Sequence, residues 1–180
     1  MSMAALQPVS EPVAYVVMGV SGCGKSLVGD AIAKHFGVEF VEGDALHPEA
    51  NIAKMSQGIP LDDADRLPWL DRIGAAIRAS LDDGKDIVIS CSALKKIYRD
   101  RLRDFVDGRL TFVFLDGSEA VLTARLTARN GHFMPASLLK SQLATLERPI
   151  GEDRVITVDI AGSQVDVIEN ALEELGNCTR

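Results

Sequence analysis

The sequence has few cysteines and no long apolar run, and each of these absences excludes a class of protein. Its three cysteines, Cys23, Cys91 and Cys178, are unevenly spaced, which fits a reducing compartment better than a disulfide framework. No apolar stretch approaches the roughly 18 residues that a membrane-spanning helix needs. Residues 1–12 contain neither the basic start nor the apolar stretch of a signal peptide. We therefore expect a cytoplasmic protein without a membrane partner, beginning with a disordered tail over residues 1–12.

Positive charge is also scarce. The chain has 19 Lys and Arg against 26 Asp and Glu, a net charge of −7 at pH 7. Nucleic-acid binders normally carry a basic balance, so we expect no nucleic-acid partner, and an anionic substrate would need local Lys and Arg. The 180 residues are 47% hydrophobic and 25% charged, which suits one soluble domain with a real core. We place this domain at residues 13–180.

Short apolar runs alternate with amphipathic stretches along the chain, a pattern typical of a parallel α/β sheet. The expected strands cover residues 13–18, 38–41, 87–91, 110–115 and 154–160. The expected helices cover residues 25–36, 48–58, 68–84, 92–106, 119–129, 136–147 and 164–175, with Pro48, Pro68 and Ser92 as their start signals. These elements predict one doubly wound, five-stranded parallel sheet flanked by helices on both faces.

Residues 19–26 read Gly-Val-Ser-Gly-Cys-Gly-Lys-Ser and match the phosphate-binding pattern G-x-x-x-x-G-K-[ST]. Glycines let the backbone turn its N–H groups toward a phosphate, and the helix that follows points its positive end at the same anion. Lys25 can reach the β- and γ-phosphates of ATP, and the Ser26 hydroxyl can bind Mg²⁺. Cys23 is interpreted as a tolerated small residue. The expected nucleotide contacts are Gly19, Ser21, Gly22, Cys23, Gly24, Lys25 and Ser26.

A phosphate loop alone does not distinguish a kinase from other nucleotide-binding proteins. A GTPase would carry an N-K-x-D base-recognition motif, which the sequence lacks. The short chain and simple topology favour a small-molecule kinase.

Three further groups of polar residues lie where predicted strands or helices end. Asp44 follows the second strand, where a carboxylate can orient or deprotonate an acceptor hydroxyl. Arg66 can hold a substrate carboxylate through two hydrogen bonds, or it can form a surface ion pair. Residues 91–96 place two lysines at a helix N-terminus, although most of the basic run over residues 95–103 is expected to face solvent. Trp69, the only tryptophan, is expected to anchor the core.

Arg125 and Arg129 are four residues apart and so share a helix face. The irregular segment that follows, bounded by Gly131 and Pro135, can act as a lid that closes over ATP. The alternative is an ordinary surface helix and loop.

Five stretches, taken together, resemble the gluconate kinases, small P-loop kinases related to shikimate and nucleoside-monophosphate kinases. They are MGVSGCGKS (18–26), GDALHP (43–48), DRLPWL (65–70), CSALKK (91–96) and GHFM (131–134). Shorter matches lie at Asn51, Lys54-Met55, Gly58-x-Pro60-Leu61, Tyr98-Arg99-Asp100, Ser141-Gln142 and Thr145-Leu146-Glu147. The likeness spans residues 13 to about 175. The first stretch is widespread, whereas GDxLHP, DRxPWL and CSALK are specific to this family.

The resemblance implies a P-loop NTPase fold with a mobile lid near residues 129–136, and commonly a homodimer. It implies Mg²⁺-dependent transfer of the ATP γ-phosphate to the 6-hydroxyl of D-gluconate, giving 6-phosphogluconate. Lys25, Asp44 and Arg129 would be catalytic, and Arg125 would lie beside the nucleotide. The implied substrate-binding residues are Asp44, His47, Lys54, Arg66, Lys95 and His132.

Two alternatives remain open at this point. The chain can be a kinase of the same architecture acting on shikimate or a different sugar acid. It can also be a nucleotide-binding regulatory module without catalysis, although the presence of Lys25, Ser26, Asp44 and Arg66 speaks against that.

Overall fold

The computed structural model describes residues 11–128 and 136–178. Within these ranges five parallel strands form one sheet in the order β2-β3-β1-β4-β5, which confirms the predicted sheet. The strands are β1 (Ala14–Met18), β2 (Glu39–Val41), β3 (Ile87–Ser90), β4 (Leu110–Asp116) and β5 (Val155–Asp159). The central strand β1 is buried along its whole length, as an apolar run in a doubly covered sheet should be.

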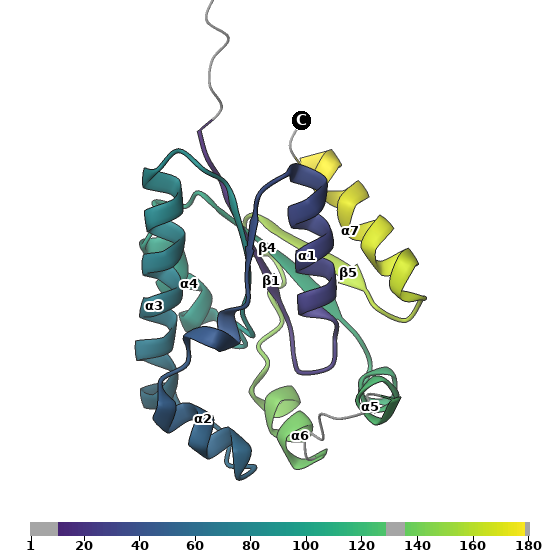
Figure 1. Cartoon of the computed structure of the whole chain (residues 1–180). Helices are drawn as coiled ribbons and strands as arrows, with labels where there is room; N and C mark the ends of the chain where they lie inside the picture. The colour runs from purple at the N-terminus through teal and green to yellow at the C-terminus, as the bar shows by residue number, and fades with distance from the viewer. Residues whose placement is uncertain (1–10, 129–135, 179–180) are drawn as a thin grey trace, which may run out of the picture.

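Helices cover both faces of the sheet, with α1 and α7 on one face and α3 and α4 on the other (Figure 1). The helices are α1 (Lys25–Phe36), α2 (Glu49–Ser56), α3 (Asp63–Asp82), α4 (Lys96–Asp104), α5 (Glu119–Ala128), α6 (Ala136–Thr145) and α7 (Gln164–Cys178). A short 3₁₀ helix, η1, covers Gly43–Leu46. None of the helices in the described ranges combines the length and apolar character needed to cross a membrane.

The side chains of β1 alternate between two cores because successive residues of a strand point to opposite faces. Tyr15 and Val17 belong to the core beneath α1 and α7. Ala14, Val16 and Met18 belong to the core beneath α3 and α4. Trp69 is 1% exposed in this second core, which confirms its expected role as an anchor.

Two predicted helix starts are wrong. Helix α3 begins at Asp63, and Pro68 lies inside it. The true N-terminus is a capping box, in which the Asp62 and Asp65 carboxylates each accept a hydrogen bond from the other residue's backbone N–H. Helix α4 begins at Lys96 and not directly after Ser92.

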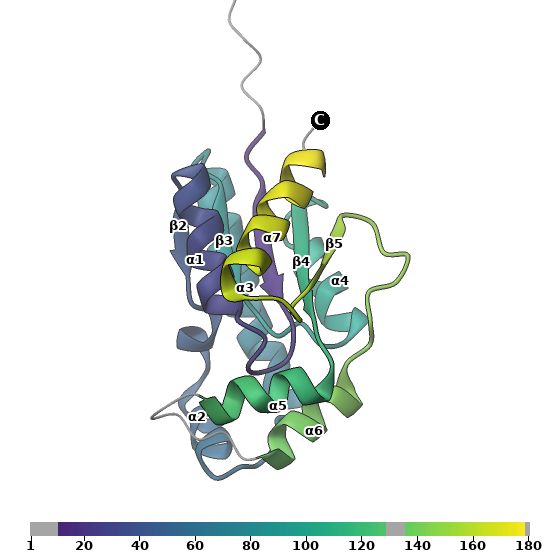
Figure 2. The same cartoon turned by 90° about the vertical axis from the view of Figure 1, so that its right-hand side faces the viewer.

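The carboxyl ends of the strands meet at one edge of the sheet, and α2, α5 and α6 lie beyond that edge (Figure 2). In an open α/β sheet this is the edge where ligands bind. The predicted lid over residues 129–136 and tail over residues 1–12 lie almost entirely outside the described residues, as does the structure of Arg129 and His132.

Candidate active site

The phosphate loop joins the end of β1 to the start of α1. Gly22 and Gly24 adopt φ angles of 84° and 98°, in the left-handed region that side chains disfavour. No side chain caps α1, and its first turn contains no acidic residue. The positive end of the helix therefore faces the loop without a competing anion. Lys25 Nζ donates to the carbonyl of Val20 at 3.1 Å, so the ammonium group lies against the loop.

Cys23 packs underneath this loop. The side chain is 0% exposed, and burial raises the pKa of its thiol. A Cβ built on Gly19 would lie 2.8 Å from Cys23 Sγ, so the sulfur fills the space that glycine leaves. These contacts are those of a packing residue.

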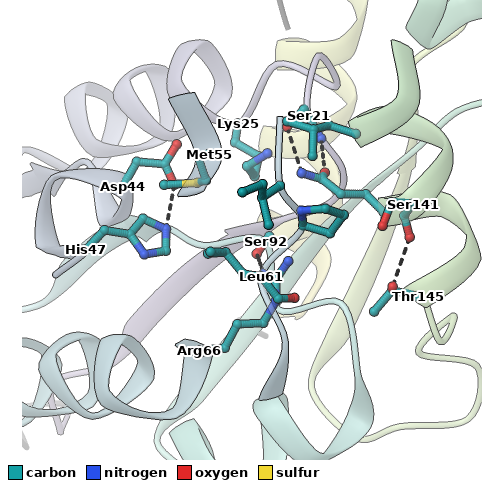
Figure 3. Close-up of a pocket in the computed structure, with 14 residues that line it drawn as sticks. Ser21, Lys25, Asp44, His47, Met55, Leu61, Arg66, Ser92, Ser141 and Thr145 are labelled. Atoms are coloured by element: carbon teal, nitrogen blue, oxygen red, sulfur yellow. Dashed lines mark hydrogen bonds and ion pairs between the residues drawn. The ribbon is translucent and has the colours of Figure 1, made fainter. Parts of the chain in front are cut away.

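A pocket opens between the phosphate loop and the ends of β2 and β3 (Figure 3). Lys25 borders it on the loop side, while Asp44 and Arg66 border it on the other sides. The Asp44 side chain is 71% exposed. The full lining is Ser21, Lys25, Asp44, His47, Met55, Ile59, Pro60, Leu61, Arg66, Ser92, Leu138, Ser141, Gln142 and Thr145.

Arg66 is the buried cation of this pocket. It is 7% exposed, and it donates from Nε to the Leu61 carbonyl and from a terminal nitrogen to Ser92 Oγ, both at 3.3 Å. These contacts are long for charge-assisted hydrogen bonds, and no carboxylate among the described residues forms an ion pair with Arg66. The guanidinium group is therefore available to an anionic ligand.

His47 is buried beside Asp44. The imidazole stacks on the Trp69 indole at 4.0 Å between ring centroids, and Nε2 lies 3.8 Å from Asp44 Oδ1. Burial lowers the pKa of His47 to about 4, while the Asp44 carboxylate opposes that shift and Arg66 adds to it. The ring is therefore neutral at physiological pH.

Lys54 and Lys95 both pair with carboxylates of α3 and do not line the pocket. Lys54 Nζ is 2.7 Å from Asp65, and Lys95 Nζ is 2.8 Å from Asp63. The hydrogen bond from Lys95, followed by one from Tyr98, lowers the pKa of Asp63. Each lysine would have to leave its partner to reach a substrate.

Arg125 lies beside the phosphate loop. Its guanidinium group donates to the carbonyls of Ile160 at 2.6 Å and Gly162 at 3.2 Å. A Cβ built on Gly24 would lie 3.6 Å from another of its nitrogens. The arginine therefore bridges the loop and the segment after β5.

Helix α6 supplies pocket residues for which the sequence analysis assigned no role. Ser141, Gln142 and Thr145 line the pocket together with Leu138, and Ser92 does so from the segment after β3. The spacing of Leu138, Ser141, Gln142 and Thr145 puts them on one helix face. Ser141, Gln142 and Thr145 belong to the residues that carry the family resemblance, but the resemblance gave them no role at the site.

The donor set at the loop fits a magnesium ion that arrives with the nucleotide. Ser26 is exposed in the first turn of α1. No group of three or more His, Cys, Asp or Glu in the described ranges forms a metal cage. Mg²⁺ keeps several waters and binds substrate phosphates with only one or two protein oxygens, so a single serine hydroxyl is an adequate protein ligand.

The sheet order and the phosphate loop after the central strand define a P-loop kinase fold. A family model described as an AAA domain matches residues 15–149. The gluconokinase of Gluconobacter oxydans (strain 621H) is 50% identical over 165 residues, covering 92% of this chain and 90% of the relative. The thermosensitive gluconokinase of Escherichia coli (strain K12) is 46% identical over 156 residues, covering 86% and 83%.

A solved structure agrees with these relatives. The crystal structure of a gluconokinase from Sinorhizobium meliloti 1021 superposes with a TM-score of 0.87 and 54% identity, covering 93% of this chain and 94% of that chain. The chain therefore belongs to the gluconokinase family of P-loop kinases, as the sequence motifs predict.

Proposed function

We propose that this protein transfers the γ-phosphate of ATP to the 6-hydroxyl of D-gluconate, giving 6-phosphogluconate and ADP. The observation that carries the proposal is a single pocket lined by Lys25 of the phosphate loop, the exposed carboxylate of Asp44 and the buried guanidinium of Arg66. A phosphate donor and an acidic, hydroxylated acceptor can meet there. The gluconokinase relatives support the choice of acceptor.

The phosphate loop binds and orients the donor. The backbone N–H groups of the loop and the start of α1 hold the phosphates, and Lys25 neutralises charge that develops on the transferring group. In the transfer step the acceptor oxygen forms a bond to the γ-phosphorus, while the bond to the β–γ bridging oxygen breaks and ADP leaves. The Ser26 hydroxyl would help to hold Mg²⁺, which would supply further neutralisation of the phosphate charge.

Asp44 orients the acceptor hydroxyl and accepts its proton. The carboxylate is exposed to the pocket, so it can reach a substrate hydroxyl without first breaking a buried contact. Phosphoryl transfer depends mainly on positioning and electrostatic stabilisation. Asp44 therefore contributes by holding the acceptor oxygen in line as well as by taking its proton.

Arg66 binds the carboxylate of gluconate. It is buried, forms no ion pair in the described structure, and presents a planar fork that matches a carboxylate. Lys54 and Lys95 are already neutralised by Asp65 and Asp63. We therefore assign these two lysines to the ordering of α3 around the pocket, with a direct role in binding only after their ion pairs open.

The proposal also gives roles to residues other than the described residues that line the pocket. Arg125 would neutralise charge on the nucleotide, and Arg129 and His132 would approach the substrates from the lid. Glu42 would hold the end of β2 in place, because its carboxylate accepts a hydrogen bond from Ser90 Oγ on β3 at 2.5 Å. A cytoplasmic homodimer is the expected form of the protein.

A coupled assay of ADP release tests the proposal. Purified protein with Mg²⁺-ATP is offered gluconate, shikimate, glucose, other sugar acids and nucleoside monophosphates. Strong preference for gluconate is the expected result. Faster ADP release with another acceptor would support kinase activity but contradict gluconate as the substrate. No ADP release with any acceptor would contradict catalysis.

A further inference from the structure

The His47 imidazole is held in one orientation by buried neighbours on two sides. Its side chain is 3% exposed, and its ring stacks on Trp69 with an interplanar angle of 16°. Trp69 is itself fixed, because its Nε1–H donates to the carbonyl of Gly43 at 2.8 Å. Trp69 therefore holds both the backbone next to Asp44, through Gly43, and the imidazole of His47, through the ring stack.

Asn51 determines which ring nitrogen of His47 carries the proton. Asn51 Nδ2 is 2.8 Å from the backbone carbonyl of Asp65. A carbonyl only accepts hydrogen bonds, so the atom facing it must be the amide nitrogen. This same nitrogen lies 3.2 Å from His47 Nδ1. An amide nitrogen only donates, so Nδ1 must be the acceptor and the proton of the neutral ring is on Nε2.

The proton-bearing nitrogen is the one beside Asp44. The distance from Nε2 to Asp44 Oδ1 is 3.8 Å, longer than a hydrogen bond. The Asp44 side chain is 71% exposed and is therefore able to change rotamer toward the ring. Figure 3 shows the imidazole and the Asp44 carboxylate facing each other at the pocket wall.

We propose that His47 is a positioning residue whose Nε2–H, fixed by Asn51, donates a hydrogen bond to the Asp44 carboxylate when the acceptor hydroxyl is bound. This inference rests on the proposed function, in which Asp44 receives the acceptor proton. A neutral N–H donor suits that role. It orients the carboxylate, whereas an imidazolium would stabilise the anion strongly and make it a weaker base.

Nuclear magnetic resonance of the ¹⁵N-labelled wild-type protein tests the tautomer without any reaction. The chain has 3 histidines, and His35→Gln and His132→Gln variants identify the His47 signals by elimination. We expect one protonated nitrogen, Nε2, and one unprotonated nitrogen, Nδ1, unchanged between pH 8 and pH 6. Two protonated nitrogens, or a proton on Nδ1, would overturn the proposal.

Kinetics of a double-mutant cycle test the action through Asp44. His47→Phe keeps an aromatic ring for the Trp69 stack and removes the N–H donor. We expect kcat to fall roughly tenfold, in line with the loss of a hydrogen bond to a charged group. In an Asp44→Asn background the same change should have almost no effect on kcat, because the group being positioned no longer acts as a base. His35→Phe, at the exposed far end of α1, is the matched control and should leave kcat unchanged.

The outcomes separate this inference from the proposed function. If wild-type protein fails to phosphorylate gluconate, the proposed function fails while the tautomer experiment still reports on Asn51 and His47. If the protein is active and the effects of His47→Phe and Asp44→Asn multiply independently, His47 does not act through Asp44 and the inference is wrong. If His47→Phe does not fold, the nuclear magnetic resonance spectra of the wild-type protein still test whether the His47 proton is on Nε2, and a proton on Nδ1 would overturn the proposal.

Discussion

The side-chain amide of Gln142 makes two hydrogen bonds with Ser21 of the phosphate loop. Gln142 Oε1 accepts from the Ser21 backbone N–H at 2.8 Å, and Gln142 Nε2 donates to Ser21 Oγ at 3.1 Å. These residues are 121 positions apart in the chain. Helix α6 is thereby attached to the loop that binds phosphate.

Gln142→Glu should weaken ATP binding. The substitution preserves shape and one acceptor, but it removes the donor to Ser21 Oγ and places a negative charge beside the phosphates. We expect the Kd for ATP, measured by calorimetry, to rise roughly tenfold, the size expected for losing a hydrogen bond and adding a repulsive charge. Gln142→Met is the neutral control of similar length and should cost less. Equal losses in the two variants would show that charge at this position is irrelevant.

Asp44→Asn should lower kcat while leaving ATP binding nearly intact. The amide keeps the size of the side chain but cannot accept the acceptor proton, and general-base contributions are on the order of 10²-fold or more. Steady-state kinetics with saturating gluconate, together with ATP titration, separate the two effects. Asp30→Asn, on the α1 helix and paired with Lys34, is a matched control that should leave kcat unchanged. An unchanged kcat in Asp44→Asn would remove Asp44 from the mechanism.

Arg66→Lys should raise the KM for gluconate and spare the KM for ATP. Lysine keeps the charge but loses the two-pronged geometry that matches a carboxylate, and we expect roughly a tenfold increase. Arg72→Lys, an exposed substitution on the same helix, provides the comparison. A rise confined to the KM for ATP would place Arg66 with the nucleotide.

Arg99→Met should destabilise the fold strongly. Most of the basic run over residues 95–103 was expected to face solvent, but Arg99 does not, because its side chain is 0% exposed. Its guanidinium group donates to the carbonyls of Ala93, Leu94 and Glu147 and to the Glu152 carboxylate. Breaking one partner of such a buried pair costs about 3–5 kcal/mol. Urea denaturation measures this loss.

Arg101→Met is the control for this variant. Arg101 pairs with Asp71 on the surface, and an exposed pair contributes about 1 kcal/mol or less to the free energy of unfolding. A similar decrease in the free energy of unfolding in both variants would contradict a stabilising role for the buried contacts of Arg99.

Acid should reduce the difference between wild type and Arg99→Met. The hydrogen bond from Arg99, with a further one from Arg103, lowers the pKa of Glu152 in the folded chain. A carboxyl group with a lowered pKa stabilises the fold at pH values above its unfolded pKa, about 4.3 for glutamate, and loses this contribution as the pH falls through the folded pKa. The stability difference should therefore be constant from pH 8 to about pH 5.5 and shrink below about pH 4.3. A difference independent of pH down to the acid transition would contradict a charged Glu152 as the partner.

A helix could be predicted accurately from the sequence where residues typical of helix termini flank it on both sides. Helix α1 begins and ends at the predicted residues, because Gly24 and Gly37 both adopt left-handed conformations at its caps. The phosphate loop was predictable for a similar reason, since its chemistry depends on eight consecutive residues. The position of Asp44 also followed from local order, because it lies three residues after the end of β2, whose carboxyl end must reach the ligand edge.

Competing local signals misled the prediction where two were present. Pro68 is a good helix-start residue, but the Asp62 and Asp65 capping box lies upstream and starts α3 earlier. Ser92 is a good N-cap residue, yet its hydroxyl accepts from Arg66. The first N–H of α4 donates instead to the Glu147 carboxylate, 51 residues away. A cap supplied from a distant segment leaves no pattern near the helix that it caps.

The sequence by itself determined the strands, the phosphate loop and the family, because each depends on residues adjacent in the chain or on recognisable motifs. Only the tertiary structure decided which of the implied substrate-binding cations is available in the pocket. The resemblance names Lys54, Arg66 and Lys95, but Asp65 and Asp63 neutralise the two lysines, whereas Arg66 lines the pocket. It also decided the proton position on His47, which depends on the Asn51 amide and, through it, on a backbone carbonyl of α3. Both outcomes depend on ion pairs and hydrogen bonds between separate segments. These interactions form only when folding brings the segments together, so no local sequence pattern indicates them.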